Sequence, residues 1–202
     1  HTCVILDNGD VKCWGYNARG ALGDGGQSGS YLYSVPSYVV DLGENRTAVS
    51  LGKGFHAYHT CAILDNGELK YWGDDDWGQL GDGGTNTDTS APSPTAIDLG
   101  TGRTAVAVAL GLVHTCAILD NGDVKCWGSD SLGVLGDGGS NTNTNAPSST
   151  AIDLGPGRTA VAIAAGSSHS CAILDTGDVK CWGAARALGL VLPSRSTYID
   201  KP

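Results

Sequence analysis

The sequence predicts an all-β protein, a β-propeller of four-stranded antiparallel blades, with about three complete blades and partial ones at each end. A segment beginning His-Thr-Cys starts at His1 and returns at His59, His114 and, in altered form, His169, at spacings of 58, 55 and 55 residues. Each copy carries strand and turn signals, and glycine supplies 31 of 202 residues, which favours many tight turns. One such sheet cannot bury both faces alone, so the copies must stack, and radial stacking gives a propeller.

Each copy contains a hairpin. Residues 116–119 and 124–127 flank an Asp-Asn-Gly loop whose glycine would take the left-handed conformation. This register places Cys116 opposite Cys126 in a non-hydrogen-bonded pair, where Cα atoms approach to about 4.5 Å, within reach of a disulfide. The same count in the other copies predicts three disulfides: Cys3–Cys13, Cys116–Cys126 and Cys171–Cys181.

Two further strands are expected before each hairpin. They comprise residues 96–99 and 104–110 in one copy and 151–154 and 159–164 in the next, separated by glycine-rich corners. The small apolar run 105–109 suits an inner strand between neighbouring sheets, where large side chains have little room. A helix is the competing interpretation of this run.

We expect a single repeat domain over residues 1–202. Its predicted divisions are a partial blade with its connecting loop (1–38), three blades with loops (39–95, 96–150 and 151–197) and the start of another blade (198–202). Open sheet edges tend to pair with other strands. The chain is therefore either part of a longer protein, which we favour, or an incomplete ring that is completed by another chain.

The recurring string, seen in full from His114 to Gly128 and followed by a Leu-Gly-Asp-Gly corner, resembles the regulator of chromosome condensation repeat. The resemblance implies a seven-bladed propeller, of which this chain would form about half. The family's founding member exchanges nucleotide on a small GTPase while held on chromatin by a basic tail, and no exchange motif matches here residue by residue. Other members are secreted binding proteins, including a β-lactamase inhibitor. The most specific matches are the Trp-Gly pairs at Trp14, Trp72, Trp127 and Trp182 and the corners beginning at Leu22, Leu80 and Leu135.

Cysteine usage predicts the compartment. Three disulfides are typical of an oxidising environment, so we expect a secreted or cell-surface protein. Cys61 is the seventh cysteine, and Tyr71 occupies its partner's position. Cys61 is either a buried unpaired thiol or bonds to another chain or to a segment outside this sequence. Asn45-Arg46-Thr47 is the one Asn-x-Thr acceptor and predicts a glycan at Asn45 in a eukaryotic secreted protein.

Charge and motif content exclude several function classes. A net charge of −9 argues against nucleic-acid binding, which relies on clustered Lys and Arg. The longest apolar run, 105–113, is about half of what a bilayer-spanning helix needs. The sequence has no phosphate-binding Gly-Lys-Ser/Thr loop, zinc-binding helix, Cys-x-x-Cys pair or Gly-x-Ser-x-Gly elbow. We therefore predict no cofactor, no metal and no catalytic residue, and interpret the recurring His1, His59, His114 and His169 as structural.

Two departures from the repeat are candidate contact loops. Asp74-Asp75-Asp76-Trp77 suits a cation or a basic partner, with a solvated acidic loop as the competing interpretation. Phe55 and His56 lie in an inserted segment and are candidates for exposed contacts.

The sequence thus predicts a non-catalytic extracellular binding or assembly module. It would contact a protein partner, a glycan or copies of itself through loops and sheet edges. Two alternatives stay open: a guanine-nucleotide exchange factor for a small GTPase, and a propeller-fold enzyme such as a lyase or hydrolase with a site on the axis.

Overall fold

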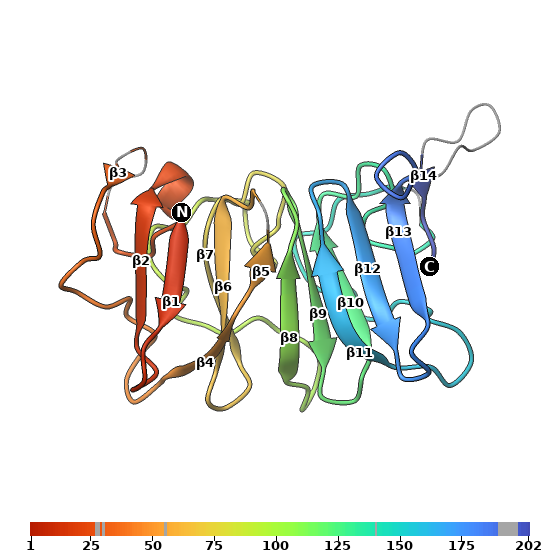
Figure 1. Cartoon of the computed structure of the whole chain (residues 1–202), viewed down its shortest axis with the longest axis horizontal. Helices are drawn as coiled ribbons and strands as arrows, with labels where there is room; N and C mark the ends of the chain where they lie inside the picture. Colours follow the sequence, from red (N-terminus) through yellow and green to blue (C-terminus); the bar gives the residue numbers. More distant parts are fainter. Residues whose placement is uncertain (27–28, 30, 55, 140, 190–197) are drawn as a thin grey trace.

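The computed structural model describes residues 1–26, 29, 31–54, 56–139, 141–189 and 198–202. It contains four sheets that follow one another in chain order across the molecule (Figure 1). Among the described residues, the helical structure is one short 3-10 turn, η1 (Ala18–Gly20), and no helix is long and apolar enough to cross a bilayer.

The strands divide among the sheets in a regular way. The first sheet contains β1 (Thr2–Ile5), β2 (Val11–Tyr16) and β3 (Tyr31–Leu32), and the second contains β4 (Ala48–Leu51), β6 (His59–Leu64) and β7 (Leu69–Gly73). The third contains β5 (Lys53–Gly54), β8 (Ala105–Leu110), β9 (His114–Leu119) and β10 (Val124–Gly128), and the fourth contains β11 (Ala160–Ala165), β12 (His169–Leu174), β13 (Val179–Ala184) and β14 (Tyr198–Ile199).

The predicted hairpin register is confirmed. In the third sheet Cys116 pairs with Cys126, and the backbone N–H of Leu119 donates to the carbonyl of Asp123 at 2.9 Å. Gly122 closes the turn with φ +81°, a backbone conformation that residues with a side chain rarely adopt. The structure forms the three disulfides Cys3–Cys13, Cys116–Cys126 and Cys171–Cys181, each with a Cα–Cα distance of 4.1 Å.

The alanine- and valine-rich run forms strand β8, so the helix interpretation is wrong. Between Ala105 and Ala107 the register with β9 shifts, and Val106 at this bulge is exposed. The second and fourth sheets have the same shift in β4 and β11. Small side chains in these strands allow neighbouring sheets to approach, with contacts between β6 and β8 and between β8 and β11.

The strands expected at 96–99 and 151–154 are not formed. Ile97 donates its N–H to Leu69 at 3.2 Å, and Ile152 donates to Val124 at 2.8 Å, so each segment follows the outer edge of the preceding hairpin. Their apolar side chains are held by burial between two sheets and not by a strand ladder.

The outer edge of each sheet is formed by chain that follows the hairpin. In the second and third sheets this chain forms single bridges, from Thr89 to Gly73 and from Thr144 to Gly128. In the first and fourth sheets it forms the short strands β3 and β14, which pair with β2 at Gly15 and with β13 at Gly183. Residues 198–199, expected to start another blade, therefore extend the last sheet.

The inserted segment changes sheet. After Gly52, strand β4 leaves β6, and Lys53–Gly54 pairs in parallel with Ala109–Leu110 of β8. The remaining pairings between named strands are antiparallel. The segment that follows β4 of the second sheet thus forms β5, the edge strand of the third sheet (Figure 1).

Each pair of consecutive sheets encloses its own hydrophobic core, and each core contains one fully buried tryptophan: Trp72, Trp127 or Trp182. The stacked arrangement expected from the repeats is therefore confirmed. Cys61 is a free thiol opposite Tyr71 within the middle core and is completely buried. Burial raises the pKa of this thiol to about 12. In this structure Cys61 is therefore a buried unpaired thiol, the first of the two interpretations.

Candidate interaction surface

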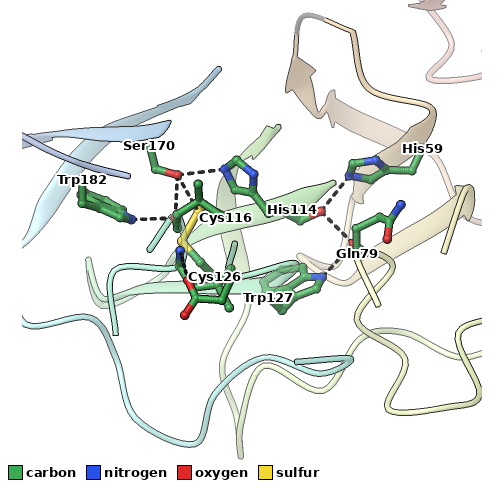
Figure 2. The surroundings of a disulfide bond; sticks show 12 residues. His59, Gln79, His114, Cys116, Cys126, Trp127, Ser170 and Trp182 are labelled. Atoms are coloured by element: carbon green, nitrogen blue, oxygen red, sulfur yellow. Dashed lines mark hydrogen bonds between the residues drawn. A yellow bond between two sulfur atoms is a disulfide. The ribbon is translucent and has the colours of Figure 1, made fainter. Parts of the chain in front are cut away.

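The residues that recur in every unit form a joint between consecutive sheets (Figure 2). At the joint between the second and third sheets, the Gln79 carbonyl accepts hydrogen bonds from Trp127 Nε1 at 3.0 Å and Thr115 Oγ1 at 2.8 Å. His59 Nε2 lies 2.9 Å from the same threonine hydroxyl. The same arrangement recurs at the other two joints. The joint between the first and second sheets uses the Ala21 carbonyl with Trp72, Thr60 and His1. The joint between the third and fourth sheets uses the Val134 carbonyl with Trp182, Ser170 and His114.

The hydrogen bonds of the joint determine which ring nitrogen of each histidine carries the proton. Because the Thr115 hydroxyl gives its one proton to Gln79, it must accept from His59, which therefore carries its proton on Nε2. Burial, together with the neighbouring His114, lowers the pKa of His59 to about 3. Burial and the neighbouring His169 likewise lower the pKa of His114 to about 4. His59 and His114 are thus buried, hydrogen-bonded members of the joints, as the structural interpretation expects.

Glycine allows two recurring motifs, the Leu-Gly-Asp-Gly corner and the Trp-Gly pair, to pack together across each joint. Gly23, in the corner that follows Leu22, has φ +68°, and a Cβ there would lie 2.7 Å from Trp72 Nε1. Gly81 and Gly136 lie in the same way against Trp127 and Trp182. The Leu-Gly-Asp-Gly corner of one unit is therefore the packing site for the tryptophan of the next.

The four residues 74–77 do not act as one exposed loop. Asp75 is completely buried, and its Oδ1 accepts the backbone N–H of Leu80 at 2.9 Å. Asn17 and Asp130 make the same bond in their units, to Leu22 and Leu135. Asp75 therefore holds the corner of its own unit. The prediction of Asp75 as a contact residue is wrong, because its side chain is buried.

The other carboxylates of this segment face an arginine. Asp74, Asp76 and Asp88 place one oxygen each within 4.8 Å of one another, and Arg19 from the first unit forms ion pairs with Asp76 at 2.7 Å and Asp88 at 3.1 Å. Arg19 is thus a cationic partner from the chain itself for two of these carboxylates. Trp77, beside the cluster in sequence, is 47% exposed.

The insertion and the acidic segment meet at one end of the sheets. Asp74 donates its N–H to the carbonyl of Tyr58 at 3.1 Å. Two adjoining pockets of about 350 and 360 Å³ share Tyr16 and Tyr58 as lining residues, and both tyrosines are partly exposed. We call the end formed by residues 17–23, 52–54, 56–58 and 74–80 the loop face. His56 is exposed here with φ +73°, and Phe55 lies outside the described residues.

Asn45 lies in the corner before β4. It is exposed and has φ +54°, and the equivalent positions are Gly102 at +69° and Gly157 at +67°. A Cβ on either glycine would meet nothing within 4 Å, so this corner is open to solvent in each unit.

Sequence reasoning missed two recurring sets of charged residues. Lys70 and Lys125 are buried, and each ammonium donates to carbonyls of a connecting segment, those of Ser93 and Pro94 or that of Leu99. A lysine recurs in the sequence directly before the Cys-Trp or Tyr-Trp pair, and this recurrence could have identified these residues. The second set is one exposed ion pair per corner: Arg46–Asp65, Arg103–Asp120 and Arg158–Asp175. Such exposed pairs contribute little to stability.

The buried Asp75 predicts an unusual dependence of stability on pH. Burial, opposed by the Leu80 N–H and reinforced by Asp82, Asp88 and Asp74, raises the pKa of Asp75 to about 6. An unfolded aspartate titrates near pH 3.9. Between these values the folded state holds the proton more tightly, so this group makes the free energy of unfolding fall as pH rises from about 4 to 6.

Asp75→Asn should therefore stabilise the protein above pH 6, on the order of 1 kcal/mol, because an amide keeps the bond to Leu80 without a buried charge. Asn17 already shows this arrangement and donates from Nδ2 to Asp24 at 3.3 Å. Urea unfolding at pH 4.5 and pH 8 measures the effect, and Asn17→Asp is the reverse control. Equal losses for Asp75→Asn at both pH values would contradict the prediction.

The repeated joint can be compared with known proteins. Sequence profiles of the Regulator of chromosome condensation (RCC1) repeat match residues 1–21, 66–118, 105–134 and 160–185, more than half of the chain. The chain belongs to the RCC1 repeat family. The corner and joint motifs described above are thus RCC1 repeat features.

Relatives of this RCC1 repeat protein differ widely in size. It is 32% identical over 197 residues to the mitochondrial RCC1 domain-containing protein RUG3 of Arabidopsis thaliana, covering 96% of this chain and 42% of that protein. It is 27% identical over 183 residues to the human E3 ubiquitin-protein ligase HERC2, covering 91% of this chain and 4% of that protein. The chain thus spans less than half the length of either relative.

A solved structure shows the same fold. Prp20p from Saccharomyces cerevisiae superposes with a TM-score of 0.78 at 20% identity, covering 99% of this chain and 48% of that one. The RCC1 repeat chain therefore has the architecture of part of an RCC1 propeller.

Proposed function

We propose that this RCC1 repeat chain is a non-catalytic binding module that contacts a protein partner through its loop face. One observation carries the proposal: the recurring residues are used in joints and corners, whereas residues that break the repeat meet at the loop face. Tyr58 belongs to the insertion, Trp77 follows the acidic cluster, and both side chains are about half exposed. Partly exposed aromatic residues are enriched where proteins bind one another.

Known RCC1 propellers support protein binding as the class of function. Prp20p has been described with its binding properties to Gsp1p and histones, and yeast RCC1 has been crystallised with Kap60. The ligase activity in the name of HERC2 is not extended to this chain, which corresponds to 4% of that protein.

Retention of partners tests the proposal. The immobilised protein is exposed to medium or extract of its source cells, and retained proteins are quantified by mass spectrometry. We expect Tyr58→Ser combined with Trp77→Ser to reduce retention of the specific partner at least tenfold. Val161→Ser, which changes an exposed valine on β11, is the matched control and should retain the partner. Equal retention by all three proteins, or strong stimulation of GDP release from a small GTPase, would overturn the proposal.

We further propose that the module works in an oxidising compartment and carries a glycan at Asn45. Three disulfides that each join adjacent strands support the compartment, and the open corner leaves room for a glycan. A disulfide closing a loop of about ten residues stabilises by roughly 2.5–3 kcal/mol in the chain-entropy description.

Intact-mass analysis of the protein isolated from its source tests both parts of this proposal. Under denaturing conditions without reductant, we expect alkylation of one cysteine, Cys61, and of seven after reduction. A mass excess removed by peptide-N-glycosidase should locate to Asn45. Alkylation of all seven cysteines before reduction would exclude the oxidising compartment, and an unmodified peptide containing Asn45 would exclude the glycan.

A further inference from the structure

Three tyrosine rings form a stack at the outer edge of the first sheet, where β3 lies beyond β2 (Figure 1). Tyr16 pairs with Tyr31 across these strands, and their ring centroids are 4.6 Å apart with 23° between the ring planes. The Tyr33 ring continues the stack, 5.6 Å from the Tyr31 ring at 12°. Leu32 points to the opposite face and packs against the core between the first and second sheets. The tyrosines therefore project from the face that is turned away from the second sheet.

The stack is specific to the first unit. The pairing of Gly15, Gly73 and Gly128 with the following chain aligns the units. The positions of Tyr16, Tyr31 and Tyr33 are taken by Asp74, Asp88 and Ser90 in the second unit and by Ser129, Asn143 and Asn145 in the third. Neither set contains an aromatic residue, so the repeat forms its sheets and joints without these rings. Exposed residues that break a repeat are candidates for contacts.

A ligand can join this stack only at its end. An inserted planar group would need about 7 Å between two rings, twice the contact distance of about 3.5 Å. The centroid distances of 4.6 and 5.6 Å leave no such space. Tyr31 stacks on both other rings, so Tyr33 is an end ring, and it is 89% exposed. The free face of Tyr33 is therefore where a further planar group can stack.

Charge and shape together favour arginine. Aromatic faces attract cations, and the net charge of −9 favours a basic partner. The guanidinium group is planar and stacks on rings, whereas the lysine ammonium is a compact point charge. The second unit offers a parallel: Asp88, at the position of Tyr31, pairs with Arg19 of the preceding unit at 3.1 Å and stays 28% exposed. An arginine thus already approaches this position of a sheet.

We infer that an arginine side chain of the protein partner stacks its guanidinium group on the free face of Tyr33 and extends the tyrosine stack. Tyr16, at the other end of the stack, lines both pockets of the loop face together with Tyr58, so the two surfaces are continuous. The inference rests on the proposed function for the protein that carries the arginine. The preference of the stack for guanidinium is a property of this chain and can be measured alone.

Titration with an isolated arginine analogue tests the inference. The protein labelled with ¹³C-tyrosine is titrated at pH 7 with Nα-acetyl-arginine methylamide, and the ring signals are followed by NMR. We expect a saturable change at Tyr33, with a dissociation constant on the order of 10–100 mM for a single side chain. Tyr38 is the internal control, because it is 39% exposed but bonds through its hydroxyl to Asp24, and its signals should change far less.

Two related probes separate charge from shape. Nα-acetyl-citrulline methylamide keeps the planar group without the charge, and Nα-acetyl-lysine methylamide keeps the charge without the planar group. Both should bind more weakly than the arginine analogue, by roughly threefold or more. Maltotriose, which tests sugar stacking, should leave Tyr33 unchanged.

Tyr31→Ser combined with Tyr33→Ser should abolish binding, measured on the side-chain protons of the arginine analogue, without changing the unfolding temperature. Val35→Ser is the matched control, because Val35 is 56% exposed in the same segment, and it should bind normally. No change at Tyr33, an equal change at Tyr38, equal binding of citrulline or lysine, undiminished binding by the double variant, or a response to maltotriose would overturn the inference. The titration needs no partner, so it can fail independently of partner retention by the Tyr58 and Trp77 variants.

Discussion

Trp127→Ala is expected to lower the free energy of unfolding by about 3–5 kcal/mol, because it removes a large, fully buried side chain from the core between the second and third sheets. The change also leaves the Gln79 carbonyl with one donor in place of two. Urea unfolding followed by circular dichroism measures the loss.

Trp77→Ala is the matched control for this loss. Trp77 is 47% exposed and lies outside the core clusters, so its removal should cost less than about 1 kcal/mol. Trp127→Phe separates the two contributions at the joint, since it keeps most of the apolar area and removes the N–H donor. Similar losses for Trp127→Ala and Trp77→Ala would show that the joints do not hold the sheets together.

Gly81→Ala should destabilise the protein by about 2–5 kcal/mol. Gly81 has φ +79°, where an L-residue is strained by roughly 1–2 kcal/mol, and its Cβ would collide with the Trp127 ring at a further cost of about 1–3 kcal/mol. Thermal and urea unfolding measure the combined effect.

Gly102→Ala isolates the collision from the strain. Gly102 has φ +69°, and a Cβ there would meet nothing within 4 Å, so this substitution should cost about 1–2 kcal/mol. If the two glycine variants lose the same stability, the tryptophan moves aside freely and the corner does not position it. A larger loss at Gly81 assigns the difference to packing across the joint.

Much of the fold was predictable because the hairpin register is a local property. The Asp-Asn-Gly loop fixes the pairing, and the pairing alone places Cys116 opposite Cys126. Segment 96–99 could not be placed in the same way. Its alternating apolar residues predict a strand, but Ile97 and Leu99 are held by burial between sheets, which depends on both neighbours.

The candidate site was predictable only in outline. The sequence showed where the repeat breaks, at residues 52–58 and 74–77, and the structure brings the described residues of both breaks to the loop face. It did not show that Asp75 is buried, although Asn17 and Asp130 at equivalent positions were a signal that this position accepts a backbone N–H. The pairing of Lys53–Gly54 with β8 could not be foreseen either, because it depends on the neighbouring sheet.

The joint draws its tryptophan and hydroxyl from one unit and its carbonyl and histidine from the unit before it. An extra copy of residues 105–159 inserted in tandem would therefore meet matching partners on both of its flanks. The joints themselves therefore place no limit on the number of units, and the number is set by what lies at the two outermost sheets.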